Sequence, residues 1–219
     1  MSPSQDTRHR LLKAARRLFA ERGFDGASVR AITGAAGTNV AAVGYHFGSK
    51  EELYKEVIRA LDAPLAEWIV ALSHDEETPV RQRIRLLLHE VFQHLWDNPD
   101  QTRFMVELRL YRTEWLLDLA EILAPITEAL IRLVRQGQAQ GVIREGEPLL
   151  LAMSLMAQPV YFMLVTRKIP EGILPVEPCT DQGRAVYLDH MVDFALAGLA
   201  PVPPGVRGEG ADPQERRAS

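Results

Sequence analysis

The sequence predicts an all-α protein, in which a small N-terminal domain of three helices precedes a larger helical domain. Three observations carry this prediction. Apolar residues recur at three- and four-residue spacings along most of the 219-residue chain, as in helices with one buried face. Short turns separate the expected helices within residues 1–50, whereas the helices lengthen beyond Pro64. No stretch alternates apolar and polar residues as a half-buried strand does.

The domain at 1–50 is expected to hold three short helices. The first has apolar residues at i, i+3, i+4, i+7 and i+8 from Leu11 and ends near Gly23. Ser28 suits the N-cap of a second helix, and Asn39 suits the N-cap of a third that runs to about Phe47. Helices joined by such short turns form a compact unit.

A fourth helix is expected to connect the two domains over 49–61. The run Ser49-Lys50-Glu51-Glu52 forms a capping box at its start. Glu51 and Lys55 are spaced i, i+4, in the orientation that favours an ion pair along the helix surface.

The larger domain is expected over 64–200. A clean helical stripe runs from Ile84 to Leu95 and is closed by Asn98-Pro99. Pro125 is expected to kink or interrupt one of the later helices. Those later helices are predicted at about 101–112, 115–140, 148–167 and 181–199, with a loop over 167–180 and a disordered tail over 201–219.

Composition indicates a cytoplasmic protein. The single cysteine, Cys179, excludes an intramolecular disulfide, and no secretory signal is visible at the N-terminus. The apolar stretch Leu149–Val165 is at the lower length limit for a membrane span and contains Gln158 and Pro159. A buried interface helix is the better interpretation of this stretch.

Charge is unevenly distributed along the chain. Residues 1–60 carry ten Lys and Arg against six Asp and Glu, a net +4, and the remainder carries 15 against 23, a net −8. A basic small segment beside an acidic larger one is typical of a polyanion-binding domain joined to a separate regulatory domain.

Residues 28–50, SVRAITGAAGTNVAAVGYHFGSK, have the parts of a helix-turn-helix, whose second helix enters the major groove of DNA. Val43 and Phe47 are expected to dock on the first two helices, so that Ala41 and Tyr45 project from the opposite side. Small residues at 41, 42 and 44 would let the helix backbone approach DNA closely, with alanine methyls touching thymine methyls. Phosphate donors would be Tyr45, His46, Lys50, and Ser28 with the adjacent helix-start amides.

This stretch resembles the DNA-binding domain of the TetR/AcrR family of bacterial regulators. The features that carry the resemblance are LLKAARRLFAERGFDGASVRAI, the turn AAGTN and YHFGSKEELY, which together cover 8–54. Many members have tyrosine where Gly44 stands, so a contact often made there is missing. Carried over by position, the family's DNA contacts fall on Ser28, Arg30, Asn39, Val40, Ala41, Ala42, Gly44, Tyr45, His46 and Lys50.

The resemblance implies that the larger domain binds an effector and dimerises; its LMAQPVYF segment is similar to the CecR-like subgroup. The apolar helices 148–167 and 181–199 are expected to pack against their symmetry mates in an isologous homodimer. Pro159 frees a backbone carbonyl for a ligand or a neighbouring side chain. Candidate ligand-binding residues, each of which could equally be plain core, are Phe104, Met105, Leu108, Tyr111, Trp115, Met153, Met156, Gln158, Tyr161 and Phe162.

An enzyme is not expected. Glu90 and His94 share a helix face, yet they have no identifiable nucleophile or metal partner. His46 has no second ligand at a sensible local spacing, so neither a metal nor a cofactor is expected.

The sequence therefore predicts a ligand-responsive transcriptional regulator, a repressor released from a palindromic operator in double-stranded DNA by a small molecule. In the proposed mechanism the ligand tilts the fourth helix and changes the separation of the two DNA-binding domains. Two alternatives stay open: a small-molecule-binding protein whose DNA binding is vestigial, and a DNA-binding dimer that needs no effector.

Overall fold

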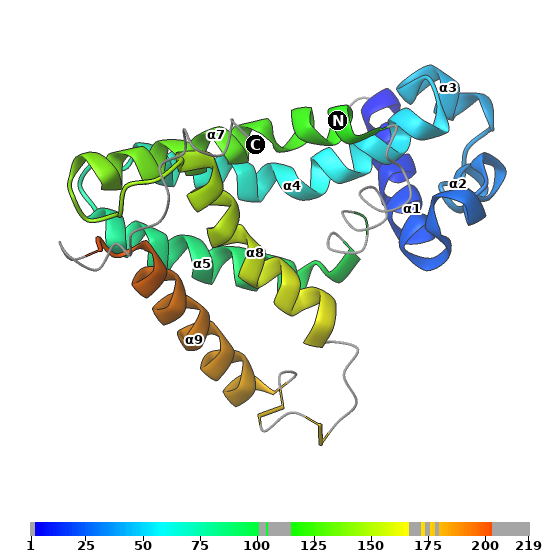
Figure 1. Ribbon diagram of the computed structural model, residues 1–219. Helices are drawn as coiled ribbons and strands as arrows, with labels where there is room; N and C mark the ends of the chain where they lie inside the picture. The colour runs from blue at the N-terminus through cyan, green and yellow to red at the C-terminus, as the bar shows by residue number, and fades with distance from the viewer. Residues whose placement is uncertain are drawn as a thin grey trace, which may run out of the picture.

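The computed structural model describes residues 3–100, 104, 115–166, 172–173, 176–177 and 180–202. Within these ranges the chain forms helices without a strand, which agrees with the all-α prediction. Figure 1 shows α1 to α3 at one end of the molecule and the longer helices extending away from them. The expected helix at 101–112, most of the 167–180 loop and residues 203–219 lie outside the described residues.

The N-terminal unit consists of α1 (Pro3–Gly26), α2 (Val29–Ala35), α3 (Ala41–Phe47) and the first half of α4 (Lys50–His74). Gly23 leaves the helical region with φ 69° and ψ 177°, so α1 is broken where the sequence indicated. Phe19, Ile32 and Tyr54 are fully buried in one apolar core formed by these four helices.

One helix, α4, spans both units. It continues through Pro64 to His74, beyond the expected end of the fourth helix at 61. A proline costs a helix one hydrogen bond, and α4 is packed on both sides of it. Ile58 and Leu61 belong to the N-terminal core, whereas Leu65 and Ile69 belong to the core of the larger unit.

The larger unit contains α5 (Val80–Asp97), α7 (Leu116–Ala139), α8 (Pro148–Thr166) and α9 (Asp181–Leu199). α7 lies along α4, while α8 and α9 both pack against α5 (Figure 1). Pro125 does not interrupt α7. The length and composition of Pro148–Val165 in α8 would suffice for a membrane span, yet this helix packs against α5, α7 and α9.

Candidate nucleic-acid interface

Local capping positions the helix-turn-helix. The Ser28 hydroxyl accepts a hydrogen bond from the Ala31 backbone N–H at 3.1 Å, at the start of α2. Asn39 Oδ1 accepts one from the Ala42 N–H at 3.0 Å, at the start of α3. Between them the chain turns at Gly37, whose φ of 64° is readily adopted only by glycine. Ser28 is the N-cap of α2 as predicted, whereas the Asn39 side chain caps α3 from the residue before its N-cap, Val40.

The two faces of α3 differ sharply. Val43 is buried in the N-terminal core and Phe47 packs against it, as predicted. Tyr45 is 81% exposed and Val40 56% exposed. Ala42 corrects one expectation: it is only 9% exposed and belongs to the N-terminal core. The outward face of α3, together with the residue before it, thus consists of Val40, Ala41, Gly44 and Tyr45.

The charged and aromatic residues expected to contact DNA are placed unequally. Arg30 is exposed on the first turn of α2, and His46 is half-buried with its ring edge-on to Tyr45, 4.8 Å between centroids. The Lys50 ammonium lies 4.2 Å from the centroid of the Phe24 ring, a cation–π contact. Lys50 is therefore held against the N-terminal unit at the start of α4.

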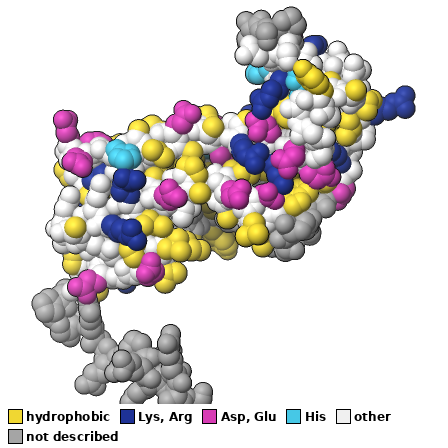
Figure 2. Space-filling model, turned by 90° about the horizontal axis from the view of Figure 1, so that it is seen from above, with side chains coloured by type: hydrophobic (Ala, Val, Ile, Leu, Met, Phe, Trp, Pro, Cys, Tyr) yellow, Lys and Arg dark blue, Asp and Glu magenta, His cyan; other side chains and the backbone are white. Residues whose placement is uncertain are grey.

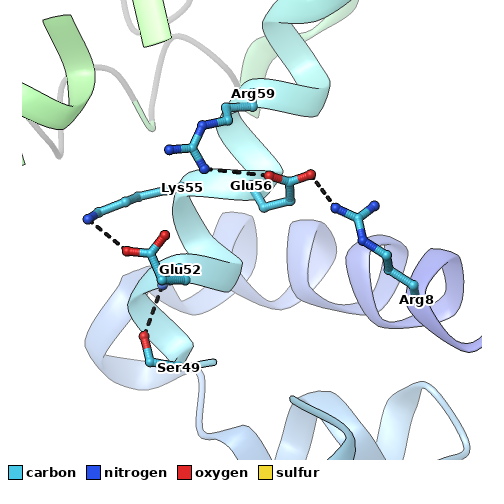
Figure 3. Close-up of polar contacts among 6 residues, drawn as sticks. All are labelled: Arg8, Ser49, Glu52, Lys55, Glu56 and Arg59. Atoms are coloured by element: carbon cyan, nitrogen blue, oxygen red, sulfur yellow. Dashed lines mark hydrogen bonds and ion pairs between the residues drawn. The ribbon is translucent and has the colours of Figure 1, made fainter. Parts of the chain in front are cut away.

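Polar contacts at the start of α4 differ in one respect from expectation. Ser49 accepts a hydrogen bond from the Glu52 N–H at 3.1 Å, which confirms the N-cap (Figure 3). Lys55, however, pairs with Glu52 at 3.0 Å and with Asp118 of α7 at 2.9 Å, and not with Glu51. The lysine points inward and reaches the neighbouring helix. The expected pair with Glu51 would instead have placed it on the solvent-exposed surface of α4.

A second ionic contact ties α1 to α4. Glu56 pairs with Arg8 of α1 and, at 3.5 Å, with Arg59 one turn further along α4 (Figure 3). Because Glu56 of α4 forms an ion pair with Arg8 of α1, the orientation of α4 is linked to that of the N-terminal unit.

The electrostatics of Lys55 keep it charged. Burial lowers the pKa of the ammonium, but its hydrogen bonds to Asp118 and Glu52 outweigh burial and raise the pKa above the ordinary value of 10.5. Charge-assisted hydrogen bonds of this kind are stronger than neutral ones.

A basic groove lies along the outside of α1. It encloses about 720 Å³, and its lining includes Arg10, Lys13, Arg16 and Arg17, with Glu21 and Asp100 opposing them. Figure 2 shows Lys and Arg side chains, interspersed with Asp and Glu, over the end of the molecule that carries α1 to α3. The charge count along the sequence indicated a basic N-terminal segment, but not this groove.

An apolar cavity of about 290 Å³ lies between α4, α5, α7 and α8. Of the candidate ligand-binding residues, Met153 and Met156 line it. Sequence reasoning missed the rest of the described lining, because those residues resemble ordinary helix core. They are Asp62, Leu65, Val91, Leu95, Leu123, Ile126, Thr127, Leu130, Leu149, Ala152, Ala157 and Val160.

Several other pocket candidates lie elsewhere. Phe104 and Trp115 belong to the N-terminal core, where their rings contact Tyr54. Phe162 is buried against Phe92 and Tyr187 and does not line the cavity.

Gln158 lines a smaller hollow between α8 and α9, and Tyr161 is 68% exposed. The helical spacing of these residues did not reveal which face of each helix meets its neighbours. Met105, Leu108 and Tyr111 lie outside the described residues.

An exposed apolar stripe runs along α8. Leu150, Met153, Ala157 and Tyr161 follow the spacing of one helix face and are all exposed. Val186 and Phe194 are exposed on the neighbouring α9. Exposed apolar area of this extent is typical of an interaction surface.

Among the described residues, no group of three or more His, Cys, Asp or Glu side chains is arranged to hold a metal ion.

The capped helix pair, with small and aromatic side chains on the outward face of α3, defines a DNA-binding protein of the helix-turn-helix class. The family model "Bacterial regulatory proteins, tetR family" matches 11–57, and "Tetracyclin repressor-like, C-terminal domain" matches 79–195. The chain therefore belongs to the tetR family of bacterial regulatory proteins. Members of this family are transcriptional regulators, not enzymes; they bind DNA as dimers and respond to small-molecule effectors.

Individual relatives agree with this assignment. The transcriptional repressor NicS of Pseudomonas putida is 28% identical over 196 residues, which cover 88% of this chain and 92% of NicS. The repressor AcnR of Corynebacterium glutamicum is 42% identical over 62 residues, which cover 28% of this chain and 33% of AcnR.

Solved structures show the same fold. The fatty acid degradation regulator FadR of Bacillus halodurans has a TM-score of 0.71 at 20% identity, covering 91% of this chain and 97% of FadR. SmeT, the repressor of a multidrug efflux pump of Stenotrophomonas maltophilia, has a TM-score of 0.68 at 22% identity, covering 94% and 100%. No comparison tests the narrower resemblance to the CecR-like subgroup, which stays a prediction.

Proposed function

We propose that this protein is a cytoplasmic, homodimeric repressor that binds a palindromic operator and is released from it by a small molecule. The observation that carries the proposal is the outward face of α3, whose small side chains leave the helix backbone open to a DNA groove. NicS and SmeT are both named as repressors, which supports repression rather than activation.

In the proposed interface, Val40 and Ala41 contact base edges, while other residues contact the sugar-phosphate backbone of the DNA. Apolar side chains of this size contact thymine methyls. Phosphate contacts fix register without reading sequence, so part of the specificity would come from DNA shape. The residues proposed to hold phosphates or the groove edge are Ser28, Arg30, Asn39, Tyr45, His46 and Lys50.

The exposed stripe on α8, with Val186 and Phe194 of α9, is the proposed dimer interface. A twofold dimer matches a palindromic site because the two recognition helices must sit about one helical turn of DNA, roughly 34 Å, or a multiple of it apart. The cavity beside α4 is the proposed effector site: its lining is largely apolar, and it adjoins the helix that connects both units.

DNA binding is tested with duplexes that the wild-type protein selects from a random-sequence library. Replacing both Tyr45 and Lys50 with alanine should weaken binding to the selected duplex at least tenfold, because each makes a proposed backbone contact. Arg132→Ala on the exposed side of α7 is the matched control and should leave affinity unchanged. Selection of no sequence, or equal binding by the double variant, would contradict the proposal.

The two alternatives give different results. If DNA binding is vestigial, the Tyr45 and Lys50 double variant leaves cellular transcript levels unchanged. If no effector is needed, no compound in a broad screen raises the melting temperature of the protein.

A further inference from the structure

The outward face of α3 carries few groups that can form hydrogen bonds. It consists of Val40, Ala41, Gly44 and Tyr45, of which only Tyr45 has a polar side-chain atom. Val40 is 56% exposed and Tyr45 is 81% exposed. A Cβ atom placed on Gly44 meets nothing within 4 Å, so no neighbouring side chain covers this position. DNA therefore meets aliphatic groups at the start of the recognition helix.

Asn39, directly before this face, is already engaged within the protein. Its Oδ1 accepts the capping hydrogen bond from the Ala42 N–H at 3.0 Å. Asparagine recognises adenine through its side-chain oxygen and nitrogen together. Such a pairing would compete with the contact that caps α3. Asn39 is therefore poorly placed to supply the hydrogen bonds that Val40 and Ala41 lack.

The major groove offers such a face one feature to recognise. Each base pair presents hydrogen-bond donors and acceptors there, and thymine adds a methyl group at ring position 5. Val40 and Ala41 cannot pair with the donors and acceptors, but their own methyl groups exclude water against another methyl group. 5-Methylcytosine carries its methyl group at the same ring position. To an aliphatic side chain, this base consequently resembles thymine and differs from cytosine.

We propose that Val40 and Ala41 read the 5-methyl groups of pyrimidines, so that 5-methylcytosine substitutes for thymine at the positions they contact. The methyl group, rather than the base pair that carries it, is the recognised feature. Cytosine methylation then strengthens binding to sequences that are weak sites when unmethylated. This inference rests on the proposed function, since it requires α3 to enter the major groove of a specific site.

The test uses the duplex that the wild-type protein selects from a random-sequence library. Thymines are replaced one position at a time, in both half-sites, by deoxyuridine, cytosine or 5-methylcytosine, each with its complementary base. Deoxyuridine removes only the methyl group, and 5-methylcytosine adds only the methyl group to cytosine. Fluorescence anisotropy measures the affinities at one fixed salt concentration, because binding to DNA depends steeply on salt.

At one or more thymine positions, deoxyuridine should weaken binding about fourfold per half-site, the factor that corresponds to burying one methyl group. At the same positions, 5-methylcytosine should bind about fourfold per half-site more tightly than cytosine, for the same reason. An equal gain from the methyl group on both bases is the signature of methyl recognition.

Val40→Ala and Ala41→Gly connect this effect to the two side chains. The ratio of affinities for the thymine and deoxyuridine duplexes is measured within one protein. A variant that only weakens α3 lowers both affinities and leaves the ratio unchanged. We expect the ratio to fall towards unity at the position that the substituted residue contacts. Val202→Ala changes an exposed valine that follows α9, and as the matched control it should keep the wild-type ratio.

The inference is overturned if no thymine position is sensitive to deoxyuridine, or if 5-methylcytosine binds no more tightly than cytosine at the sensitive positions. A sensitivity that persists unchanged in both variants also overturns it, because the effect then comes from the shape of the DNA. Failure of the wild type to select any sequence is a separate result that contradicts the proposed function itself.

Discussion

Arg83 is the most buried charged residue in the described part of the chain, at 1% exposed. Its Nη1 donates to Gln136 Oε1 at 2.9 Å and lies 3.5 Å from the carbonyl oxygens of Leu72 and Ser73. These carbonyls belong to the last turn of α4, where helix carbonyls have no intrahelical partner and the helix dipole is negative. The arginine therefore caps α4 from the neighbouring α5 and connects it to α7.

Arg83→Ala should lower the free energy of unfolding by about 3 kcal/mol or more, because it opens a cavity and removes the donor for buried acceptors. Urea denaturation followed by circular dichroism measures the effect. Arg81→Ala removes an exposed arginine two residues earlier on α5 and should change stability by no more than about 0.5 kcal/mol. Equal losses of unfolding free energy in the two variants would contradict the capping role of Arg83.

At the residue scale, features set by neighbours in the chain were predictable and features set by distant contacts were not. The capping hydrogen bonds of Ser28, Asn39 and Ser49 follow from side-chain type and a three-residue spacing. Lys55 has an equally good local partner in Glu51, yet it turns towards Asp118 on another helix. Periodicity alone could not reveal that contact, because it depends on how α7 crosses α4.

Among the elements, α4 is the one whose ends matter most, since it belongs to both cores. Hydrogen bonds with its own backbone N–H and with the Ser49 side chain hold the pKa of Glu51, in the first turn, below the ordinary value of 4.5. At the C-cap, hydrogen bonds from the Thr78 side chain and backbone, and from the Glu77 backbone, lower the pKa of Asp75 from 3.8. Charged Glu51 thus stabilises the start of α4, whereas charged Asp75 stabilises the turn that follows the helix.

Acid should therefore weaken the start of α4 and the turn that follows its end. A carboxyl whose pKa is lowered by folding binds fewer protons in the folded state, so its stabilising contribution is complete above the unfolded pKa and is lost as pH falls through the folded one. The variant Glu51→Gln with Asp75→Asn should be less stable than the wild type at pH 7. It should also lose less free energy of unfolding than the wild type between pH 5 and the acid limit.

Urea denaturation at several pH values measures both effects. Glu67→Gln, which removes an exposed carboxylate from the middle of α4, is the matched control. A double variant whose pH dependence runs parallel to that of the wild type would exclude this role for the two carboxyls.

At the scale of the whole molecule, charge is divided between the units. Residues 1–60 carry a net +4 and the remainder a net −8. DNA should be attracted to the end that carries α1 to α3 and repelled by the acidic remainder, which orients the protein before contact. The basic groove along α1 adds positive charge beside the helix-turn-helix.

Operator binding should accordingly weaken steeply with salt, and Arg30→Ala should reduce the slope of log affinity against log salt by about 1 for each phosphate that the variant no longer neutralises. Fluorescence anisotropy with the selected duplex, from low to physiological salt, measures this slope. Arg135→Ala on α7 removes an equal charge far from the proposed interface and should leave the slope unchanged. A wild-type slope near zero would be incompatible with phosphate anchoring.

The overall architecture was predictable, and the cavity was largely not. The short capped helices within 1–50 and the outward placement of Ala41 and Tyr45 depend on periodicity and caps, which are local properties. The cavity depends on the crossing of four helices, whose lining residues, such as Leu65, Val91 and Leu123, have the same spacing as ordinary core. Of the candidates proposed from sequence, only Met153 and Met156 fall among the described lining residues.

Gly44 has a consequence for how this regulator can evolve. A Cβ atom built at this position meets no other atom of the protein within 4 Å, and the residue faces outward from α3. Larger side chains can therefore be installed here without disturbing the core, and most residues favour a helix more than glycine does. Substitutions at Gly44 can change the DNA sequence preference while the fold stays intact. A duplicated copy of the gene could therefore acquire new DNA sites through a single substitution.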